Sequence, residues 1–450
     1  MNPKFLTTKT LLFFIFMMSY SSWLGNTSAD LKNEMNAHHN SSIVWAVNVG
    51  GEKYTGIDGI NYQSDEYITG GEIGKLTKIL GSQDSFIYKS YRLGDIKIDY
   101  PIENGKYNLI FKFAEPYDID IDGRLFDVIA ENNVVINNLN VRRARDGKHI
   151  SGLVTAVSDV NVTDGRLNIS FKSTKAKPIL SALVVRKQQP DDRKWNLVWH
   201  DEFEGDKLDP NKWTPDVWQA FKVNSEDQAY TERNKNIRVK DGKLIIQAHK
   251  EAYQNADYTS GRVHSKGKGD FLYGKAEIRA KIPSGNGTWS AIWMLPSDPY
   301  KYSTTCKPNE DWQGSRTCDA WPNSGEIDIM EHLGHDMGTV WGTVHNKAYY
   351  WVNWEQRKGS IIGKDLDKDF HLYSVEWTPN YIHVFLDDNL YFTYVNEQSD
   401  WKAWPYDHPY HIILNLAIGG NWGRAGGPID DSIFPVKMEV DYVRVYQLQP

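Results

Sequence analysis

Residues 325–331 read Gly-Glu-Ile-Asp-Ile-Met-Glu, a short segment with three acidic side chains separated by apolar ones. The apolar residues favour a β-strand, in which Glu326 and Asp328 point to the same face because successive side chains alternate. Glu331 would face the other way in a regular strand. One β-bulge at residues 329–330 would return it to the first face. The segment therefore predicts a bulged strand with three carboxyl groups on one side.

Such an arrangement suits a glycosidase. About four strand steps separate the Glu326 and Glu331 backbones by roughly 13 Å, and each side chain can lean inward by about 4 Å. The two carboxyl groups can then approach to about 5 to 5.5 Å, the spacing at which retaining glycosidases use one as nucleophile and the other as acid/base. Asp328 would hold a proton or hydrogen bond that keeps Glu326 ionised. The alternative is a solvated acidic face on an edge strand.

The whole chain points to a large soluble protein with an uncharged partner. Its 450 residues suggest two domains of unequal size. The net charge of -7 has no long charged run behind it, which argues against nucleic acid and anionic membrane as partners. The 17 Trp and 25 Tyr can fill cores or form stacking platforms for sugar rings.

The first residues indicate export. Lys4 and Lys9 precede an apolar run at residues 11–18, and small polar residues follow up to Ala29. This order is typical of a cleaved signal peptide over residues 1–29, so we expect a secreted, extracellular or periplasmic protein. A membrane anchor is the alternative, but the apolar run is too short to span a bilayer comfortably, and we expect no stable membrane insertion.

Cys306 and Cys318 are the two cysteines of the chain, and they enclose a short polar loop just before the acidic segment. A disulfide fits this spacing and the export signal. Two reduced thiols are the alternative. A zinc site is not expected, because the loop carries no histidine.

The rest of the chain predicts an all-β protein. Residues 30–42 are polar without a hydrophobic period and read as a disordered lead-in. Residues 43–187 contain short alternating runs separated by Asn-Gly, Asp-Gly and Gly-Gly turns, which predict a β-sandwich. The charged residues 188–194 form a linker. Residues 195–450 repeat the strand-and-turn rhythm and predict a second, larger β-sandwich without long helices.

Several motifs of the second domain occur in a characteristic order. They are Val198-Trp-His-Asp-Glu-Phe203, Thr259-Ser-Gly-Arg262, Tyr273-Gly-Lys-Ala-Glu-Ile-Arg279, Gly287-Thr-Trp-Ser-Ala-Ile-Trp-Met-Leu-Pro296, the acidic segment, Gly342-Thr-Val-His345, Phe370-His-Leu-Tyr-Ser-Val-Glu-Trp377, Asn415-Leu-Ala-Ile-Gly-Gly-Asn-Trp422 and Val440-Asp-Tyr-Val-Arg-Val-Tyr446. With them the domain resembles glycoside hydrolase family 16, in particular its laminarinase-like β-1,3-glucanases. The resemblance implies a β-jelly-roll sandwich with a concave substrate cleft, Glu326 as nucleophile, Asp328 as its assistant and Glu331 as acid/base. The inserted Met330 marks the bulged branch of the family, to which laminarinases and agarases belong.

The resemblance also implies substrate-binding residues in the cleft. They are Asn224, Arg262, Trp289, Trp293, His345 and Trp422. The two tryptophans of the Gly287 motif would form the floor and wall of the central sugar sites, the Asn and Arg would bind hydroxyl groups, and the histidine would lie beside the acid/base. Core packing is the alternative for these two tryptophans, and a satisfied sheet histidine is the alternative for His345.

Members of the family often hold a structural Ca2+ on the convex face. The matching positions here are Glu202, Gly242 and Asp441, and oxygen ligands suit this ion. Asp441 could equally be an exposed strand residue. No cofactor is expected for catalysis.

The first domain carries a second set of ordered motifs. They are Ala46-Val-Asn-Val-Gly-Gly51, Tyr62-Gln-Ser-Asp65, Phe113-Ala-Glu-Pro-Tyr117, Leu125-Phe-Asp-Val128 and Ile179-Leu-Ser-Ala-Leu-Val-Val185. With them residues 43–187 resemble a malectin-like carbohydrate-binding domain. The resemblance implies that exposed rings of Tyr62, Tyr88 and Tyr117 stack on sugar. Asp118 replaces an expected aromatic residue, so a purely structural role is the alternative.

Together these features predict a secreted, retaining endo-glycosidase that cuts internal β-1,3 bonds of laminarin-type β-glucan. Action on another β-glycan, such as mixed-linkage glucan or a galactan, by hydrolysis or transglycosylation is one alternative, because the same carboxylates serve each substrate. A non-catalytic β-glucan recognition protein is the other, but both glutamates are present. We expect a monomer.

Overall fold

The computed structural model describes residues 42–187, 191 and 193–448. The predicted signal peptide, the lead-in up to residue 41 and most of the linker lie outside the described residues. The described chain is built almost entirely of strands, with helices of four residues at most, which confirms the all-β prediction. Among the described residues, no helix combines the length and the apolar character that crossing a membrane requires.

The N-terminal domain is a β-sandwich. One layer has the strand order β1-β14-β8-β11 and the other β10-β9-β12-β7-β4, and their apolar faces enclose a core rich in Phe, Ile, Leu and Val. Its elements are β1 (Ile43–Asn48), β2 (Tyr54–Thr55), β3 (Asn61–Tyr62), β4 (Ile68–Thr69), β5 (Glu72–Lys75), η1 (Phe86–Tyr88), β6 (Ser90–Leu93), β7 (Lys97–Pro101), β8 (Gly105–Ala114), β9 (Leu125–Ala130), β10 (Asn133–Leu139), α2 (Val141–Ala144), β11 (Gly152–Val162), β12 (Arg166–Lys175), β13 (Ile179–Leu180) and β14 (Ala182–Lys187).

The C-terminal domain is a larger sandwich. One layer has the order β26-β25-β24-β23-β30-β21-β16, and the other is centred on β19, β31, β22, β27, β28 and β29. Its elements are β15 (Trp195–Asp201), β16 (Thr214–Pro215), β17 (Gln228–Tyr230), β18 (Ile237–Lys240), β19 (Lys243–Tyr253), β20 (Ala256–Ser260), β21 (Arg262–His264), β22 (Gly274–Lys281), β23 (Thr288–Pro296), α3 (Ala320–Asn323), β24 (Glu326–Leu333), β25 (Thr339–His345), η2 (Trp351–Asn353), β26 (Arg357–Ile362), β27 (His371–Trp377), β28 (Tyr381–Leu386), β29 (Asn389–Val395), β30 (Tyr410–Ile418), α4 (Gly420–Gly423), η3 (Asp431–Ile433) and β31 (Val436–Leu448).

Burial along the strands explains which face carries the site. In β22, every second residue is buried, as expected for a strand with one face on the core and one toward solvent. In β30 all nine residues are buried. Its Leu414 and Leu416 belong to the sandwich core, whereas Asn415 between them hydrogen-bonds Trp293 on the opposite face. The face of β30 that points away from the core is therefore also covered, by side chains of its own sheet such as Trp293.

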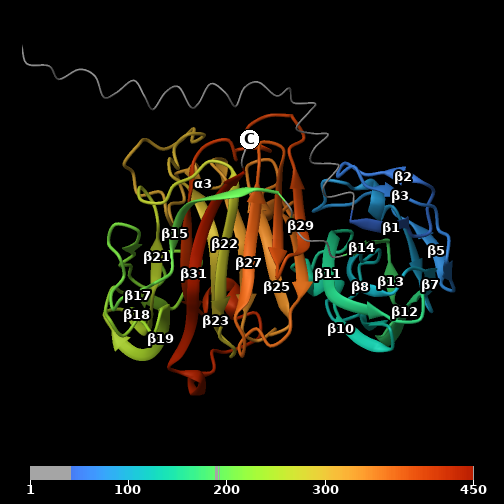
Figure 1. The fold of residues 1–450 in the computed structure, drawn as a ribbon, viewed down its shortest axis with the longest axis horizontal. Helices are drawn as coiled ribbons and strands as arrows, with labels where there is room; N and C mark the ends of the chain where they lie inside the picture. Colours follow the sequence, from blue (N-terminus) through green and yellow to red (C-terminus); the bar gives the residue numbers. More distant parts are fainter. Residues whose placement is uncertain (1–41, 188–190, 192, 449–450) are drawn as a thin grey trace, which may run out of the picture.

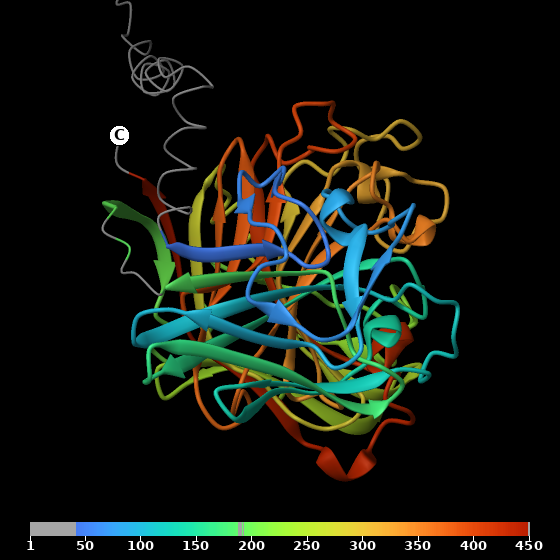
Figure 2. The same ribbon diagram turned by 90° about the vertical axis from the view of Figure 1, so that its right-hand side faces the viewer.

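The two sandwiches share one continuous sheet. Strand β11 of the first domain pairs in parallel with β26 of the second, with Thr155 opposite Ser360. The hydroxyl groups of these two residues lie 3.1 Å apart, and Ser360 also donates to the Val154 carbonyl oxygen. The N-terminal domain therefore lies beside the C-terminal sandwich in Figure 1, faces the viewer in Figure 2, and covers the edge of β26.

Cys306 and Cys318 form the predicted disulfide. Just outside the loop that it closes, the Asp319 side chain accepts hydrogen bonds from Ser303, Thr304 and Thr305 and so joins the two flanking segments. Because α3 and the acidic strand follow directly, the disulfide helps to position the entry to β24.

Candidate active site

The acidic segment forms β24, and its pairing on both sides is irregular at one place. On the side of β23, Ile329 has no pairing partner, because Trp293 pairs with Asp328 and the next residue, Ile292, pairs with Met330. Toward β25, the register shifts between Asp328 and Glu331. This is the β-bulge predicted at residues 329–330. It returns Glu331 to the side of the strand that carries Glu326 and Asp328.

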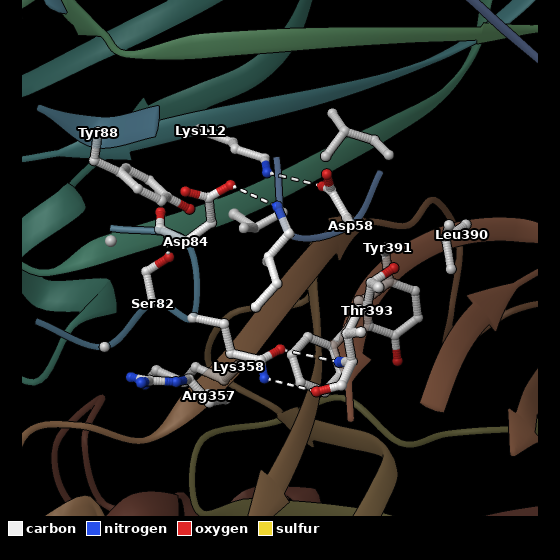
Figure 3. A pocket seen from close by; sticks show the side chains of 18 of the residues that line it. Asp58, Ser82, Asp84, Tyr88, Lys112, Arg357, Lys358, Leu390, Tyr391 and Thr393 are labelled. Carbon is white, nitrogen blue, oxygen red and sulfur yellow. Dashed lines mark hydrogen bonds and ion pairs between the residues drawn. The ribbon is translucent and has the colours of Figure 1, made fainter. Parts of the chain in front are cut away.

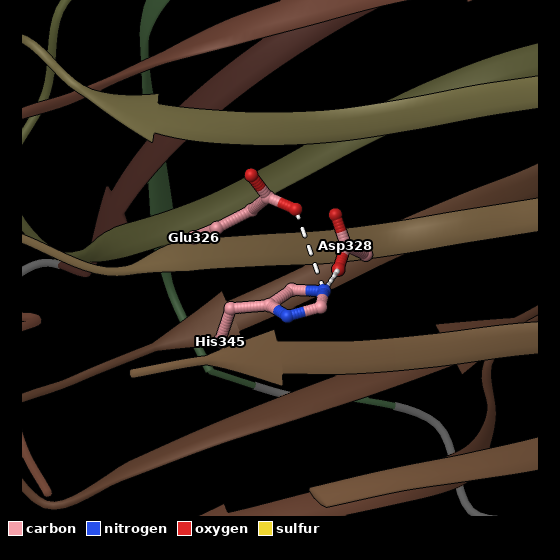
Figure 4. A group of neighbouring side chains, drawn as sticks. All are labelled: Glu326, Asp328 and His345. Carbon is pink, nitrogen blue, oxygen red and sulfur yellow. Dashed lines mark ion pairs between the residues drawn. The ribbon is translucent and has the colours of Figure 1, made fainter. Parts of the chain in front are cut away.

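Glu326, Asp328 and His345 converge on one point (Figure 4), where one polar atom of each lies within 4.8 Å of the others. His345 Nε2 is 3.5 Å from Glu326 Oε1 and 3.2 Å from Asp328 Oδ2. The indole of Trp321 donates to Glu326 Oε2 at 3.0 Å. Two nitrogen groups therefore surround Glu326 and can stabilise its negative charge.

His345 was predicted beside the acid/base; its charge does act on Glu331, but its direct contacts are with the other two carboxyl groups. The register of β24 and β25 places His345 opposite Glu326, whereas Trp341 faces Glu331 beyond the bulge. The ring consequently contacts Glu326 and Asp328 directly. Its position between two carboxylates also argues against an ordinary sheet histidine.

Glu331 has donors of its own. Trp289 Nε1 donates to Oε1 at 3.2 Å, and the Thr343 hydroxyl donates to Oε2 at 3.4 Å. The Trp289 ring also stands edge-on to Trp422, at a centroid distance of 5.7 Å. Trp289 therefore links the carboxyl group to an aromatic wall, and core packing does not describe its environment.

Burial is the first cause that raises the pKa of all three carboxyl groups, those of Glu326 and Asp328 well above the ordinary range. Repulsion raises the pKa of Glu326 further through Asp328, and that of Asp328 further through Glu331. His345 opposes this by lowering the pKa of Glu326 and of Glu331. Three buried carboxylates this close cannot all be charged, so the cluster keeps at least one proton near neutral pH.

Arg262 and Trp293 form the next part of the layer. Arg262 is buried, donates to Asp216 Oδ2 at 2.8 Å, and its guanidinium carbon lies 4.7 Å from the Trp293 ring centre and 4.3 Å from that of Trp218. Trp293 Nε1 donates to Asn415 at 2.7 Å. The structure thus brings Arg262 and Trp293, both predicted to bind substrate, into one stack.

Asn224 lies near this stack, through Glu226. Its side chain donates to Glu226 Oε1 at 3.2 Å, and Tyr230 donates to the other oxygen of the same carboxyl group. Burial raises the pKa of Glu226, and the charge of Arg262 lowers it. Asn224 is therefore held by a buried polar network, and its backbone oxygen accepts a hydrogen bond from the backbone N–H of Asn421.

Some residues of the site were missed by sequence reasoning. Trp321, Trp341 and Lys358 come from separate segments, and nothing in their local pattern marks them. The position of Trp321, five residues before Glu326, is the one signal that could have found it. Lys358 is buried on β26, with its ammonium group 4.9 Å from the Trp341 ring centre.

Lys358 also connects the site to the N-terminal domain. Its ammonium group is 3.2 Å from Asp146 Oδ2, a residue of that domain. Burial lowers the pKa of Lys358, Asp146 raises it again, and the positive charge lowers the pKa of Glu331. The N-terminal domain therefore contributes to the electrostatics of the active-site layer.

The expectation of exposed sugar-binding rings is wrong for Tyr62 and Tyr88, which are 1% and 2% exposed. The Tyr62 hydroxyl donates to Asp58, and Tyr88 lines a cavity of about 100 Å³ to which both domains contribute residues (Figure 3). Pockets for small ligands generally measure at least about 300 Å³. Tyr117, at 46% exposed, is the one predicted ring that faces solvent.

The calcium site was predicted on a backbone carbonyl at Glu202, on Gly242 and on the Asp441 carboxylate, and the side chains of the two acidic residues pair with arginines. The Asp441 carboxylate pairs with Arg279, and both carboxylate oxygens of Glu202 accept from Arg444. Gly242 lies in the turn before β19 with φ +68°. The Arg279 pair does not favour a cation at Asp441, and the calcium site stays a prediction. Within the described chain, the cluster of Figure 4 is the group of carboxylates and imidazole that could hold a metal.

Replacing Trp289 by Phe should move the pH dependence. The indole N–H lowers the pKa of Glu331, so its loss should raise that pKa further. A general acid works while it is protonated, and the alkaline limb of kcat/KM should therefore shift upward, by about one pH unit for one lost hydrogen bond. Initial rates between pH 4 and 10 measure the shift. Trp404→Phe is the control, and an unchanged limb in Trp289→Phe would refute the role of Glu331 as acid.

Comparisons with known proteins agree with this geometry. Residues 224–444 match the family model of glycosyl hydrolases family 16, and residues 43–190 match that of the malectin domain. The chain is 45% identical to a β-glucanase of Rhodothermus marinus over 281 residues, covering 60% of this chain and 93% of that protein. It is 36% identical over 283 residues to glucan endo-1,3-beta-glucosidase A1 of Niallia circulans, covering 56% of this chain and 38% of that protein.

A solved structure supports the same assignment. The laminarinase from Rhodothermus marinus superimposes with a TM-score of 0.52 at 45% identity, covering 58% of this chain and all of that one. A fold with the acidic strand at its centre is thus shared along a whole relative. The chain belongs to glycosyl hydrolases family 16, with a malectin domain ahead of its catalytic domain.

Proposed function

We propose that this protein is a retaining endo-glycosidase that hydrolyses internal β-1,3-glucosidic bonds of laminarin-type β-glucan. The observation that carries the proposal is the bulged strand β24, which gathers Glu326, Asp328 and Glu331 beside two indole donors and one imidazole. The relatives that match the catalytic domain are a β-glucanase, a glucan endo-1,3-beta-glucosidase and a laminarinase. Their names support β-1,3-glucan as the substrate.

The first step forms a covalent intermediate. A carboxylate oxygen of Glu326 bonds to the anomeric carbon, the bond from that carbon to the leaving oxygen breaks, and Glu331 gives its proton to that oxygen. The Glu326 side chain hydrogen-bonds Asp328 and lowers its pKa, so the two carboxyl groups can share one proton. When it resides on Asp328, Glu326 is ionised, and Trp321 and His345 stabilise its charge.

The second step returns the enzyme to its first state. Glu331, now a carboxylate, takes a proton from water, and the water oxygen bonds to the anomeric carbon as the bond to Glu326 breaks. Two inversions leave the product as the β-anomer. The side chains of this chain complete the reaction without a redox cofactor.

Export is part of the proposal. The basic residues and apolar run of the first 29 residues support it, and the Cys306–Cys318 disulfide is typical of an oxidising compartment. A secreted, extracellular or periplasmic monomer without stable membrane insertion fits both features. Mass spectrometry of the mature N-terminus, with cleavage expected near Ala29, and light scattering test these two points.

The activity is tested with three polymers: laminarin, mixed-linkage glucan and agarose. Reducing ends report cleavage, and NMR during the first minutes reports the anomer released. Laminarin should give β-anomer oligosaccharides of several lengths. Cleavage of agarose or mixed-linkage glucan alone would keep the site but change the substrate, and binding of glucan without any cleavage would make the protein a recognition protein.

A further inference from the structure

The loop between β25 and β26 carries large aromatic side chains in an unusual position. Trp351 is 51% exposed and Trp354 is 41% exposed, with Val352 between them 50% exposed. Tryptophan is normally well buried, so two exposed indoles on one short loop indicate a binding surface. Flat rings of this kind stack on the apolar faces of sugars, and their N–H groups can bind hydroxyls.

A row of rings links this loop to the catalytic carboxylates. Trp321, which donates to Glu326, stands edge-on to Tyr350 with ring centres 5.8 Å apart. Tyr350 in turn stands edge-on to Trp351 at 6.1 Å. Ring contacts therefore connect exposed Trp351 to the indole that binds Glu326, and Trp354 lies three residues further along the same loop. A chain bound at Glu326 can extend along this row.

The catalytic domain holds the first end of the loop. Asn346 is fully buried, and its amide donates to the hydroxyl groups of Tyr394 and Tyr406. Its side-chain oxygen accepts from the backbone N–H of Tyr349. The loop thus leaves β25 in one defined direction.

The N-terminal domain holds the other end. The backbone N–H of Gly81 donates to Glu355 Oε2 at 3.1 Å, and Arg145 donates to the Gln356 carbonyl oxygen at 3.1 Å. The ammonium group of Lys148 lies 5.6 Å from the ring centre of Trp354. Contacts from both domains pre-organise the loop, which lowers the entropic cost of binding.

We propose that Trp351 and Trp354 form a sugar-stacking platform that extends the cleft, and that the malectin domain supports this platform. The ligand is a further stretch of the same neutral β-glucan chain, so this inference rests on the proposed function. Continuity with the carboxylates favours a polysaccharide over a protein partner. Tyr62 and Tyr88 are buried and offer no comparable surface.

The platform is tested with Trp351→Ala, Trp354→Ala and the double variant. On laminarin polymer, the double variant should show a KM about tenfold higher with kcat within twofold of wild type. On a short laminari-oligosaccharide that fills the sites at the carboxylates alone, kcat/KM should be unchanged. The control is Phe86→Ala, and Tyr117→Ala tests the predicted sugar-binding ring of the N-terminal domain; each of these two rings is 46% exposed.

Binding is measured separately with Glu326→Gln protein in laminarin-containing native gels. Retardation should be lost when both tryptophans are replaced. Unchanged retardation and KM in the double variant would overturn the proposal, as would loss of binding with Tyr117→Ala instead. Failure of the proposed function gives a different result, because the wild-type protein would then cut no laminarin. The gel assay with each test polymer would still decide whether the indoles bind sugar.

The support by the malectin domain has its own test. Lys148→Met and Arg145→Gln should each raise KM for the polymer severalfold and leave the oligosaccharide unaffected. Lys148 is partly exposed, so its replacement keeps the fold if the buried Arg145 proves sensitive. The support role would be refuted if these variants changed KM equally for polymer and oligosaccharide, or if they changed neither.

Discussion

The Glu326→Gln variant should lose at least about 10⁴-fold in kcat on its glucan and become more stable. A neutral amide cannot attack the anomeric carbon, so the covalent step is lost. Replacing one of three buried, mutually repelling carboxyl groups also relieves repulsion, and the midpoint of thermal unfolding should rise. Reducing-end assays and calorimetry measure the two effects.

The matched control is Glu331→Gln. This variant should also lose polymer cleavage, yet it should still form the glycosyl-enzyme with a dinitrophenyl glycoside, because that leaving group departs without a proton. Burst release of dinitrophenol from Glu331→Gln and its absence from Glu326→Gln would separate nucleophile from acid. The reverse pattern would exchange the two roles.

Removing residues 42–187 should destabilise the catalytic domain by more than 10 °C in its unfolding midpoint, on the order of several kcal/mol. The deletion uncovers the β26 edge and leaves Lys358 without Asp146. The full chain should for the same reason unfold in a single transition. Calorimetry of both proteins checks these results.

A milder variant tests the same junction. Thr155→Asp places a charge where Thr155 is 2% exposed and contacts Ser360, so it should lower the unfolding midpoint by several degrees. Thr163→Asp, exposed just beyond β11, should have little effect. Two separate transitions in the full chain, or an unchanged midpoint after the deletion, would show that the domains are independent.

Local chemistry explains what could be predicted before the structure. The alternation of side chains along residues 325–331 predicts the strand, the odd spacing of Glu331 predicts the bulge, and the pairing irregularities at β24 confirm both. The two cysteines have no other partner in the chain, and the disulfide follows. These features depend on neighbours in the sequence.

The errors arose where distant segments meet. The direct contact of His345 with Glu326 and Asp328 could not be predicted, because the register of β25 against β24 is a property of two strands, which neither strand reveals alone. Tyr62 and Tyr88 were expected at loop tips, but side chains of the first domain and the packing of the second bury them. Exposure depends on everything that surrounds a residue.

The sequence by itself therefore determined the all-β class, the bulged strand with its three acidic residues, and the family, and it favoured the disulfide. Alternation, spacing and motif order are contained in the chain, and each needs little more than the two-residue period of a strand. The tertiary structure alone decided that β11 joins β26, that Asp146 reaches Lys358, and that two indoles remain exposed beside the cleft. Such contacts result from the burial of apolar surface summed over both domains, which no local pattern encodes.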